Sequence, residues 1–228
     1  MQLVILAAGK GSRMKEFTEV RPKPMLIVGG KHLLERKIET LPKEIDEVVL
    51  VVGYLKEHII SYFGNFFADK KITYVVCEPL GTGYALWQAR HLLGSDFVVM
   101  MGDDMYGTED VVEVIKHPWA MSTFETPGFA TAADIETDEN GYLRKADFDY
   151  EGKKEKIMLD TGLYKLKKEI FDADLVQLKN GEFGLPHTIF AHVKNTNTPL
   201  YVNKARHWLK MNSPEDLNRA EEHYMKGN

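Results

Sequence analysis

The chain has 228 residues, of which 44% are hydrophobic and 28% are charged. These fractions exclude a disordered or fibrous chain, and the length predicts one domain with a core of its own. There are 29 Lys and Arg residues against 34 Asp and Glu residues, which leaves a net charge of −5. The chain therefore lacks the basic excess that holds a nucleic-acid backbone, and we expect no nucleic-acid partner.

Cysteine usage and the N-terminal apolar run indicate a cytoplasmic protein. The single cysteine, Cys77, excludes an internal disulfide and is typical of a reducing compartment. The run Leu3–Ala8 is far shorter than the ~20 residues that span a bilayer, and it continues into glycines rather than a signal cleavage site. We therefore expect no membrane partner.

Short apolar runs alternate with amphipathic segments of helical length over the first hundred residues. The predicted strands are Leu3–Ala7, Glu47–Gly53, Ile72–Cys77 and Phe97–Met101, and the predicted helices are His32–Leu41, Lys56–Phe63 and Tyr84–Leu93. Nearly continuous apolar strands are typical of a parallel sheet covered on both faces. The alternation predicts a Rossmann-like, three-layer α/β fold with a mixed, mostly parallel central sheet.

After Gly107 the pattern indicates strands of a more antiparallel kind. These are Ala120–Glu125, Phe129–Ile135, Gly141–Ala146 and Ile157–Leu166. Asp138–Gly141 predicts a hairpin turn, because Asn-Gly readily supplies positive φ. No linker divides the chain, so residues 1–228 are expected to form one domain whose second half completes the sheet and forms an antiparallel lid.

A final helix is predicted to begin near Ser213. The hydroxyl of Ser213 suits the N-cap, and Pro214 suits the first helical position. The acidic residues that follow favour the helix dipole.

A glycine-containing turn, LAAGKGSRM at Leu6–Met14, follows the first predicted strand directly. Gly9 and Gly11 allow close approach of the backbone to a ligand, and consecutive N–H groups there can cradle phosphate oxygens. Lys10 and Arg13 add positive charge, and the guanidinium fork of Arg13 matches phosphate geometry. A Gly-x-Gly sequence alone is equally typical of a plain tight turn.

Two further segments carry charge in defined positions. Pro22 and Pro24 bracket Lys23 and hold it on a stiff, extended segment, which makes this lysine a candidate for a positioned cation. Gly102–Asp104 follows an apolar strand, where open α/β sheets bind ligands, and a carboxylate there suits a hard cation such as Mg²⁺. On its own this triplet is more typical of an acidic surface turn, and Asp104 is either a co-ligand or a turn residue.

In combination these motifs resemble those of the sugar-1-phosphate nucleotidylyltransferases. The family has a strand, then L-x-A-G-x-G-x-R-M/L, then P-K-P, as at Leu6–Met14 and Pro22–Pro24. Glu78–Ala85 resembles its E-P/Q-L-G-T-x-x-A segment, which contacts the nucleoside, and Gly102–Asp103 resembles its magnesium-binding G-D pair. The four motifs lie in the N-terminal half of the chain.

The C-terminal half shows a weaker resemblance. Asp160–Tyr164 is similar to the family strand N-T-G-I/L-Y, with Asp160 in place of asparagine, and Gly181–Phe183 is similar to the G-E-Y/F segment whose glutamate contacts sugar hydroxyls. Trp208–Leu217 resembles a closing segment in which an aspartate or asparagine supplies a second metal ligand. Lys210 replaces that aspartate, and Asn212 is the nearest candidate.

The resemblance implies that an NTP and a sugar 1-phosphate give an NDP-sugar and pyrophosphate, with Mg²⁺ as cofactor. It implies catalytic roles for Arg13, Lys23 and Asp103 and metal ligation by Asp103 and Asn212. The implied nucleotide-binding residues are Leu6, Ala7, Ala8, Gly9, Lys10, Gly11, Ser12, Glu78, Gly81 and Thr82, and the implied acceptor-binding residues are Asp160, Thr161, Gly162 and Glu182. Residues 1–107 would form the nucleotide-binding half and 108–228 the acceptor-binding half. A homo-oligomer is a family expectation, and at this length we expect no acyltransferase domain.

Two departures from the family pattern leave the substrates open. Val76 stands where members that use UTP or dTTP usually carry glutamine, and valine cannot hydrogen-bond a base edge. The family's E-K pair is missing, and Phe148 and Asp149 occupy that stretch, with Lys145 the nearest cation. Two alternatives remain. Asp160 could receive a cationic acceptor in a cytidylyltransferase for a phosphorylated amine or alcohol such as phosphocholine, and Lys210 is consistent with a catalytically silent, nucleotide-sensing subunit.

Overall fold

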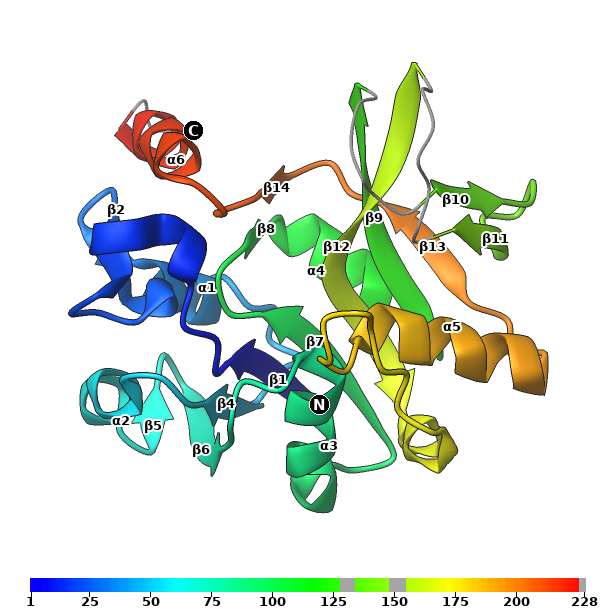
Figure 1. Cartoon of the computed structure of the whole chain (residues 1–228), viewed down its shortest axis with the longest axis horizontal. Coiled ribbons are helices and arrows are strands. Elements are labelled where there is room, and N and C mark those ends of the chain that lie inside the picture. The colour runs from blue at the N-terminus through cyan, green and yellow to red at the C-terminus, as the bar shows by residue number, and fades with distance from the viewer. Residues whose placement is uncertain (128–133, 148–154, 226–228) are drawn as a thin grey trace.

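The structure of the chain, a computed structural model, describes residues 1–127, 134–147 and 155–225 (Figure 1). Most of the predicted strand Phe129–Ile135 lies outside these residues, as do Phe148 and Asp149. The side chains of Ser12 and Arg13 are also outside the described part.

A mixed sheet forms the centre of the molecule, and within the described residues it has eight strands in the order β13-β9-β12-β7-β1-β4-β6-β5 (Figure 1). The strands are β1 Gln2–Ala7, β4 Glu47–Val52, β5 Phe66–Phe67, β6 Lys70–Val76, β7 Asp96–Met101, β9 Ala120–Pro127, β12 Lys156–Lys167 and β13 Tyr201–Lys204. β1, β4, β6 and β7 run parallel, β13 is parallel to β9, and β12 is antiparallel to both β7 and β9. The predicted α/β fold with a mixed, mostly parallel sheet is confirmed.

The side chains of β1 show why helices cover both faces of this sheet. Leu3 and Ile5 pack in one apolar cluster, whereas Val4 and Leu6 pack in another, because successive side chains of a strand point to opposite faces. The first cluster includes residues of α1 (Leu33–Glu39), α2 (Lys56–Phe63) and α4 (Thr108–Ile115), and the second includes residues of α3 (Thr82–Ala89) and α5 (Leu185–Thr196). The molecule therefore has three layers.

Two of these helices were not expected from the sequence. α1 and α2 lie within the predicted ranges, and α3 begins at Thr82, two residues before its predicted start, and gives way to a 3₁₀ helix, η3, over Arg90–Leu92. α4 is missing from the prediction, because its eight residues bury only Asp110, Val111 and Val114, which is too few for a clear helical period. α5 is missing as well, although Pro186 in its first turn is a start signal.

The strands of the second half partly join the main sheet. β9 and β12 pair over a long stretch that extends beyond the other strands (Figure 1). β10 (Asp134–Thr137) and β11 (Leu143–Asp147) form a separate antiparallel pair. The predicted turn between them is confirmed: Oδ1 of Asp138 accepts hydrogen bonds from the amides of Asn140 and Tyr142, and the positive φ falls on Gly141.

The two ends of the chain meet in a third apolar cluster, to which Met14, Leu33, Met105 and Met211 belong. The short elements around it are the 3₁₀ helices η1 Ser12–Thr18 and η2 Lys23–Met25, the paired strands β2 Ile27–Val28 and β3 Lys31–His32, the pair β8 Met105–Tyr106 and β14 Trp208–Leu209, and the helix α6 Pro214–Met225. A further 3₁₀ helix, η4, covers Lys168–Asp172. Residues 14–33 and residues 211–220 therefore pack together against Met105, in the segment that follows β7.

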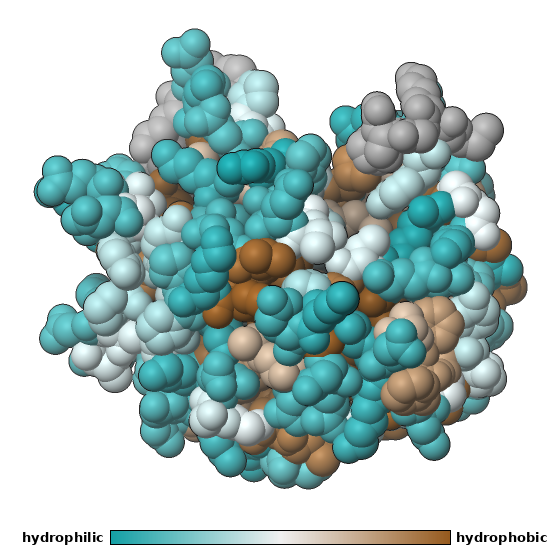
Figure 2. Space-filling view, turned by 180° about the vertical axis from the view of Figure 1, so that it is seen from behind, coloured by the Kyte–Doolittle hydropathy of each residue, from teal (hydrophilic) through white to brown (hydrophobic). Residues whose placement is uncertain are grey.

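The hydropathy of one face and of the helices can be compared with what a membrane-spanning chain requires. Hydrophilic residues cover most of the face seen in Figure 2, and hydrophobic residues gather near its centre. Within the described residues, no helix has both the length and the apolar character needed to cross a membrane.

Candidate active site

The parallel strands β6, β4, β1 and β7 end at the same edge of the sheet, where strand order reverses. From β1 the chain moves outward to β4 and β6, and it then returns to β7 on the other side of β1. Open α/β sheets bind ligands at such a reversal, beyond the carboxyl ends of the strands. The loops after β1 and β7 contain Gly9 and Asp103, so the topology brings two predicted motifs to this point.

Close backbone contacts hold these two loops side by side. The amide of Gly102 donates to the carbonyl of Leu6 at 2.8 Å, and a Cβ on Gly102 would lie 2.9 Å from that oxygen. The loop after β4 joins them, because the carbonyl of Ala8 accepts a hydrogen bond from the amide of Tyr54 at 3.2 Å. The side chains of Leu6, Ala7 and Ala8 are buried, so any contact of these residues with a nucleotide would be made by the backbone.

The loop after β1 packs directly on the Pro22–Pro24 segment. Gly11 has a φ of +66°, and a Cβ there would lie 3.0 Å from Cβ of Lys23. The hydroxyl of Thr18 donates to the carbonyl of Gly11 at 3.1 Å and fixes the turn. Gly9 differs, because a Cβ there would meet nothing within 4 Å of the described atoms.

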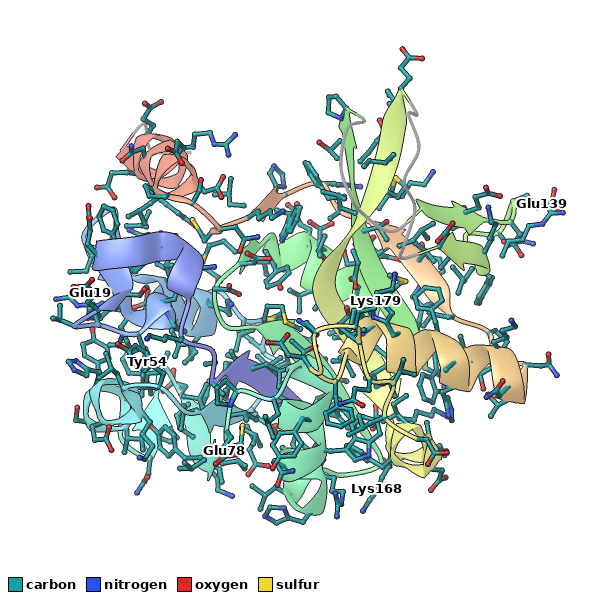
Figure 3. All side chains as sticks on the ribbon, in the orientation of Figure 1. Glu19, Tyr54, Glu78, Glu139, Lys168 and Lys179 are labelled. Carbon is teal, nitrogen blue, oxygen red and sulfur yellow. The ribbon has the colours of Figure 1, made fainter. Side chains whose placement is uncertain are left out.

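Lys10 points away from this packing. It is exposed, and its Nζ lies 5.7 Å from the centre of the Tyr54 ring. The hydroxyl of Tyr54 donates to the carbonyl of Glu19 at 2.9 Å, which ties the loop after β4 to the end of η1; the two residues are labelled in Figure 3.

Lys23, Asp103 and Asn212 meet at the centre of the candidate site. Nζ of Lys23 lies 2.5 Å from Oδ2 of Asp103 and 3.1 Å from Oδ1 of Asn212. The side chain of Lys23 is only 6% exposed, whereas that of Asp103 is 32% exposed. One carboxylate oxygen and one amide oxygen thus converge on a single cationic group, with the carboxylate open to solvent. These are the oxygen ligands that Mg²⁺ prefers.

The start of α6 sets the position of Asn212. The carboxylate of Asp216 accepts hydrogen bonds from the amides of Asn212 and Ser213 at 2.8 and 2.9 Å, and the hydroxyl of Ser213 accepts from the amide of Asp216 at 3.3 Å. This reciprocal cap confirms Ser213 as the N-cap and Pro214 as the first helical residue. Lys210, by contrast, is exposed.

Asp104 anchors the strand that leads to Asn212. Its two carboxylate oxygens accept hydrogen bonds from the indole N–H of Trp208 at 3.2 Å and from the amide of Met211 at 3.1 Å. Burial raises the pKa of Asp104 to about 7, and the negative charge of Asp103 acts in the same direction. Of the two roles considered from the sequence, these contacts favour a turn residue that holds β14.

Lys37 is a buried residue of this region that the sequence analysis missed. It lies on α1 and is 3% exposed, and its ammonium donates to the carbonyl of Met101. Burial lowers the pKa of Lys37 to about 8, although the charges of Asp103 and Asp104 oppose that shift. A lysine between apolar positions of an amphipathic helix was the available signal.

The predicted nucleoside segment lies against the predicted acceptor segment. The amide of Phe183 donates to the carbonyl of Leu80, and the amide of Gly83 donates to the carbonyl of Phe183, both at 2.9 Å. Gly81 has a φ of +106°, and a Cβ there would lie 2.4 Å from the carbonyl oxygen of Phe183. Only glycine fits this contact, since the obstructing atoms are backbone.

The side chains of this region divide between structural and exposed positions. The hydroxyl of Thr82 accepts a hydrogen bond from the amide of Leu185 at the start of α5. Glu78 and Glu182 are exposed, and Figure 3 shows Glu78 well away from Glu139 on the β10–β11 hairpin. Val76, at the end of β6, is 57% exposed and presents an apolar side chain to solvent.

Three of the four predicted acceptor residues, Asp160, Thr161 and Gly162, lie on β12 where its pairing with β9 shifts register. The carboxylate of Asp160 accepts hydrogen bonds from the amide of Gly162 at 2.9 Å and from the hydroxyl of Tyr164. Burial raises the pKa of Asp160 to about 6. Thr161 is buried, and its hydroxyl donates to the carbonyl of Ser122 at 2.9 Å. Gly162 has a φ of +76°, and a Cβ there would meet the side chain of Met101 at 2.4 Å.

Two other features lie apart from this cluster. Lys145 forms an ion pair with Glu136 at 3.7 Å on the separate β10–β11 pair. A cavity of about 680 Å³ lies at the opposite end of the sheet, and its lining includes Trp119, Asp172 and His192. None of the predicted site residues lines that cavity. Within the described residues, no group of three or more His, Cys, Asp or Glu side chains could hold a metal ion.

The fold and this strand-end cluster define an α/β protein with a candidate ligand site where the strand order reverses. The model of the nucleotidyl transferase family matches residues 2–227. The chain is 31% identical to the UTP–glucose-1-phosphate uridylyltransferase AglF of Haloferax volcanii, over 97% of this chain and 96% of that protein. The chain therefore belongs to the nucleotidyl transferase family.

One further relative supports this assignment, and one solved structure supports the fold. The chain is 32% identical to the bifunctional protein GlmU of Methanococcus maripaludis over 99% of its own length, but it spans only 54% of that relative. A crystal structure of a putative glucose-1-phosphate thymidylyltransferase from Bacillus anthracis superposes with a TM-score of 0.83 at 21% identity, covering 100% of this chain and 96% of that one. That likeness supports the fold.

Proposed function

We propose that this protein transfers a nucleotidyl group from an NTP to a sugar 1-phosphate and releases pyrophosphate. The observation that carries the proposal is the meeting of Lys23, Asp103 and Asn212 beside the loop after β1. A phosphate chain needs cations and backbone N–H donors at one place, and this edge of the sheet supplies both. Family membership and the likeness to AglF along almost its whole length agree with this chemistry.

The proposed binding mode divides the site between its two halves, 1–107 and 108–228. The N–H groups of the loop at Gly9, Lys10, Gly11 and Ser12 would face the phosphates, and the segment of Glu78, Gly81 and Thr82 would face the nucleoside. Asp160, Thr161, Gly162 and Glu182 would face the acceptor. The backbone contact between Gly81 and Phe183 supports this division, because it places the nucleoside and acceptor segments next to each other.

Asp103 and Asn212 would hold a Mg²⁺ ion. Their oxygens already converge on one cation, the Lys23 ammonium, so the donor set fits a small hard ion completed by substrate oxygens. A bound Mg²⁺ would neutralise phosphate charge and orient the phosphate oxygens.

The protein's own residues would act by positioning and by charge. A phosphate oxygen of the acceptor attacks the α-phosphorus of the NTP. The bond between the α-phosphorus and the oxygen that bridges it to the β-phosphorus then breaks, and its electron pair leaves with pyrophosphate. Lys23 would stabilise the negative charge that develops on that leaving group, and Arg13 would share this role. No covalent intermediate with the chain is needed, so orientation and electrostatic stabilisation supply the rate enhancement.

The test is pyrophosphate release by the purified protein with Mg²⁺. ATP, GTP, CTP, UTP and dTTP are each paired with a panel of sugar 1-phosphates and with phosphocholine. Turnover with one sugar 1-phosphate confirms the proposal and identifies base and acceptor together. Turnover with phosphocholine alone contradicts it and supports the cytidylyltransferase alternative, which the carboxylate of Asp160 favours because it could receive a cationic acceptor. Nucleotide binding without turnover in any pair supports a sensing subunit.

The proposal also covers the cellular location and the oligomeric state of the enzyme. A cytoplasmic location agrees with the single cysteine, and a homo-oligomer agrees with the family resemblance. Light scattering of the purified protein measures the second of these directly.

A further inference from the structure

The end of β7 is held by side chains from outside the sheet. On one side, the pairing of β7 with β1 continues to Met101 opposite Leu6. On the other side, the pairing with β12 stops two residues earlier, at Val99 opposite Tyr164. The amide of Gly102 points toward β1. Successive residues of a strand direct their backbone groups to opposite sides, so the amide and carbonyl of Met101 point toward β12, where the pairing has already ended.

Lys37 and Tyr106 satisfy both of these backbone groups. The ammonium of Lys37 donates to the carbonyl of Met101, and the amide of Met101 donates to the hydroxyl of Tyr106 at 3.3 Å. The same hydroxyl donates to the carbonyl of Thr161 at 2.9 Å, and Nζ of Lys37 lies 5.3 Å from the centre of the Tyr106 ring. One network thus joins α1, the end of β7 and the proposed acceptor strand.

We propose that Lys37 is a positioning residue for nucleotidyl transfer, which holds the end of β7 so that Asp103 keeps its place beside Lys23. This inference rests on the proposed function. Met101 precedes Asp103 by two residues, and the side chain of Asp103 is more exposed than that of Lys23, so its position depends on the backbone beneath it. Lys37 itself is buried and would act through that backbone rather than by contact with substrate.

The chain offers a matched control in Lys165. This lysine is also buried, at 2% exposure, and its ammonium binds the carboxylate of Asp96 at the opposite end of the same strand, β7. Replacing either lysine with methionine removes a buried ammonium tied to β7. Only Lys37 is tied to the end that leads to Asp103.

The experiment compares Lys37→Met, Lys37→Gln and Lys165→Met with the parent protein. Turnover number and KM are measured with the substrate pair identified by the pyrophosphate assay. We expect Lys37→Met to lower kcat roughly 100-fold, with each KM within about threefold, since small displacements of catalytic groups cost rate on this scale. Lys37→Gln, whose amide can still donate to Met101, should recover roughly tenfold of that loss, and Lys165→Met should stay within about threefold of the parent kcat.

Hydrogen exchange of the amides of Met101 and Gly102 gives a readout that needs no turnover. Lys37→Met should accelerate this exchange roughly tenfold or more, and Lys165→Met should not. The proposal is overturned by unchanged exchange in Lys37→Met, by an unchanged kcat, by a glutamine variant no better than methionine, or by an equal kcat loss in Lys165→Met. If Lys37→Met does not fold, Lys37→Gln must show intermediate values of exchange and kcat for the proposal to stand. If the parent protein releases no pyrophosphate with any pair, the proposed function fails, and exchange alone decides whether Lys37 positions β7.

Discussion

Nζ of Lys23 lies 2.5 Å from Oδ2 of Asp103, although the two residues are 80 positions apart in the chain. Lys23 is held between two prolines, and Asp103 follows the end of β7, so both charged groups stand on stiff backbone. The pair is mostly shielded on the lysine side and open on the aspartate side. It therefore leaves a carboxylate facing the place where the proposed substrates would bind.

Replacing either member of this pair should abolish most turnover without unfolding the protein. We expect Lys23→Ala and Asp103→Ala each to lower kcat roughly 100-fold or more, because each removes charge that stabilises the transition state. Circular dichroism and the pyrophosphate assay measure fold and rate. Lys31→Ala, which breaks an exposed ion pair with Glu39, is the control and should keep the parent rate. Near-normal turnover in both site variants would contradict the assigned roles.

Asn212 should control how much Mg²⁺ the reaction needs. Asn212→Ala removes one of the two converging oxygens, so the Mg²⁺ concentration at half-maximal rate should rise roughly tenfold. Asn212→Asp supplies a charged oxygen at the same place, and the required Mg²⁺ should then be no higher than in the parent protein. A titration of rate against Mg²⁺ checks both variants. Identical metal dependence in all three proteins would remove Asn212 from the metal site.

Two glycines should separate a requirement of the fold from a requirement of the ligand. Gly81→Ala should lower the free energy of unfolding by roughly 1–3 kcal/mol, because its positive φ and the backbone of Phe183 leave no room for Cβ. Gly9→Ala meets open space and should change that free energy by less than about 0.5 kcal/mol. It should nevertheless raise the KM for the NTP, since the backbone there would approach the phosphates. Chemical denaturation and steady-state kinetics give the two quantities, and an unchanged KM in Gly9→Ala would argue against phosphate binding at this loop.

Asp160 should make stability depend on pH in a defined direction. Burial raises its pKa from 3.8 to about 6, so the folded protein holds this proton more tightly than the unfolded chain. The associated stability is fully present below about pH 4 and is lost as the pH rises through about 6. Relative to Asp160→Asn, the parent protein should therefore lose roughly 1–3 kcal/mol of unfolding free energy between pH 4 and pH 7. Denaturation curves of both proteins across this range measure the difference between their unfolding free energies. A difference that does not change with pH would show that folding does not shift the pKa of Asp160.

The local features of the fold could be read from the sequence because short segments encode them. The strand Leu3–Ala7 and the helix at Lys56–Phe63 appear within a residue of their predicted ends. Their apolar spacing reflects burial on one or two faces, which is a local property. α4 was missed because its three buried residues give no clear helical period and because its contacts come from distant segments: Asp110 accepts hydrogen bonds from the amides of Arg206 and His207, far along the chain.

Within the site, the sequence by itself determined which residue types were available and which local backbone held them. The glycines of Leu6–Met14, the prolines around Lys23 and the carboxylate after β7 are readable because turn chemistry and strand ends follow from neighbouring residues. Only the tertiary structure decided that Asn212, and not Lys210, faces Lys23, that Asp104 anchors Trp208, and that Lys37 holds Met101. Each of these contacts joins segments at least 64 positions apart. Such contacts depend on how the layers close on one another, and no pattern of neighbouring residues specifies that closure.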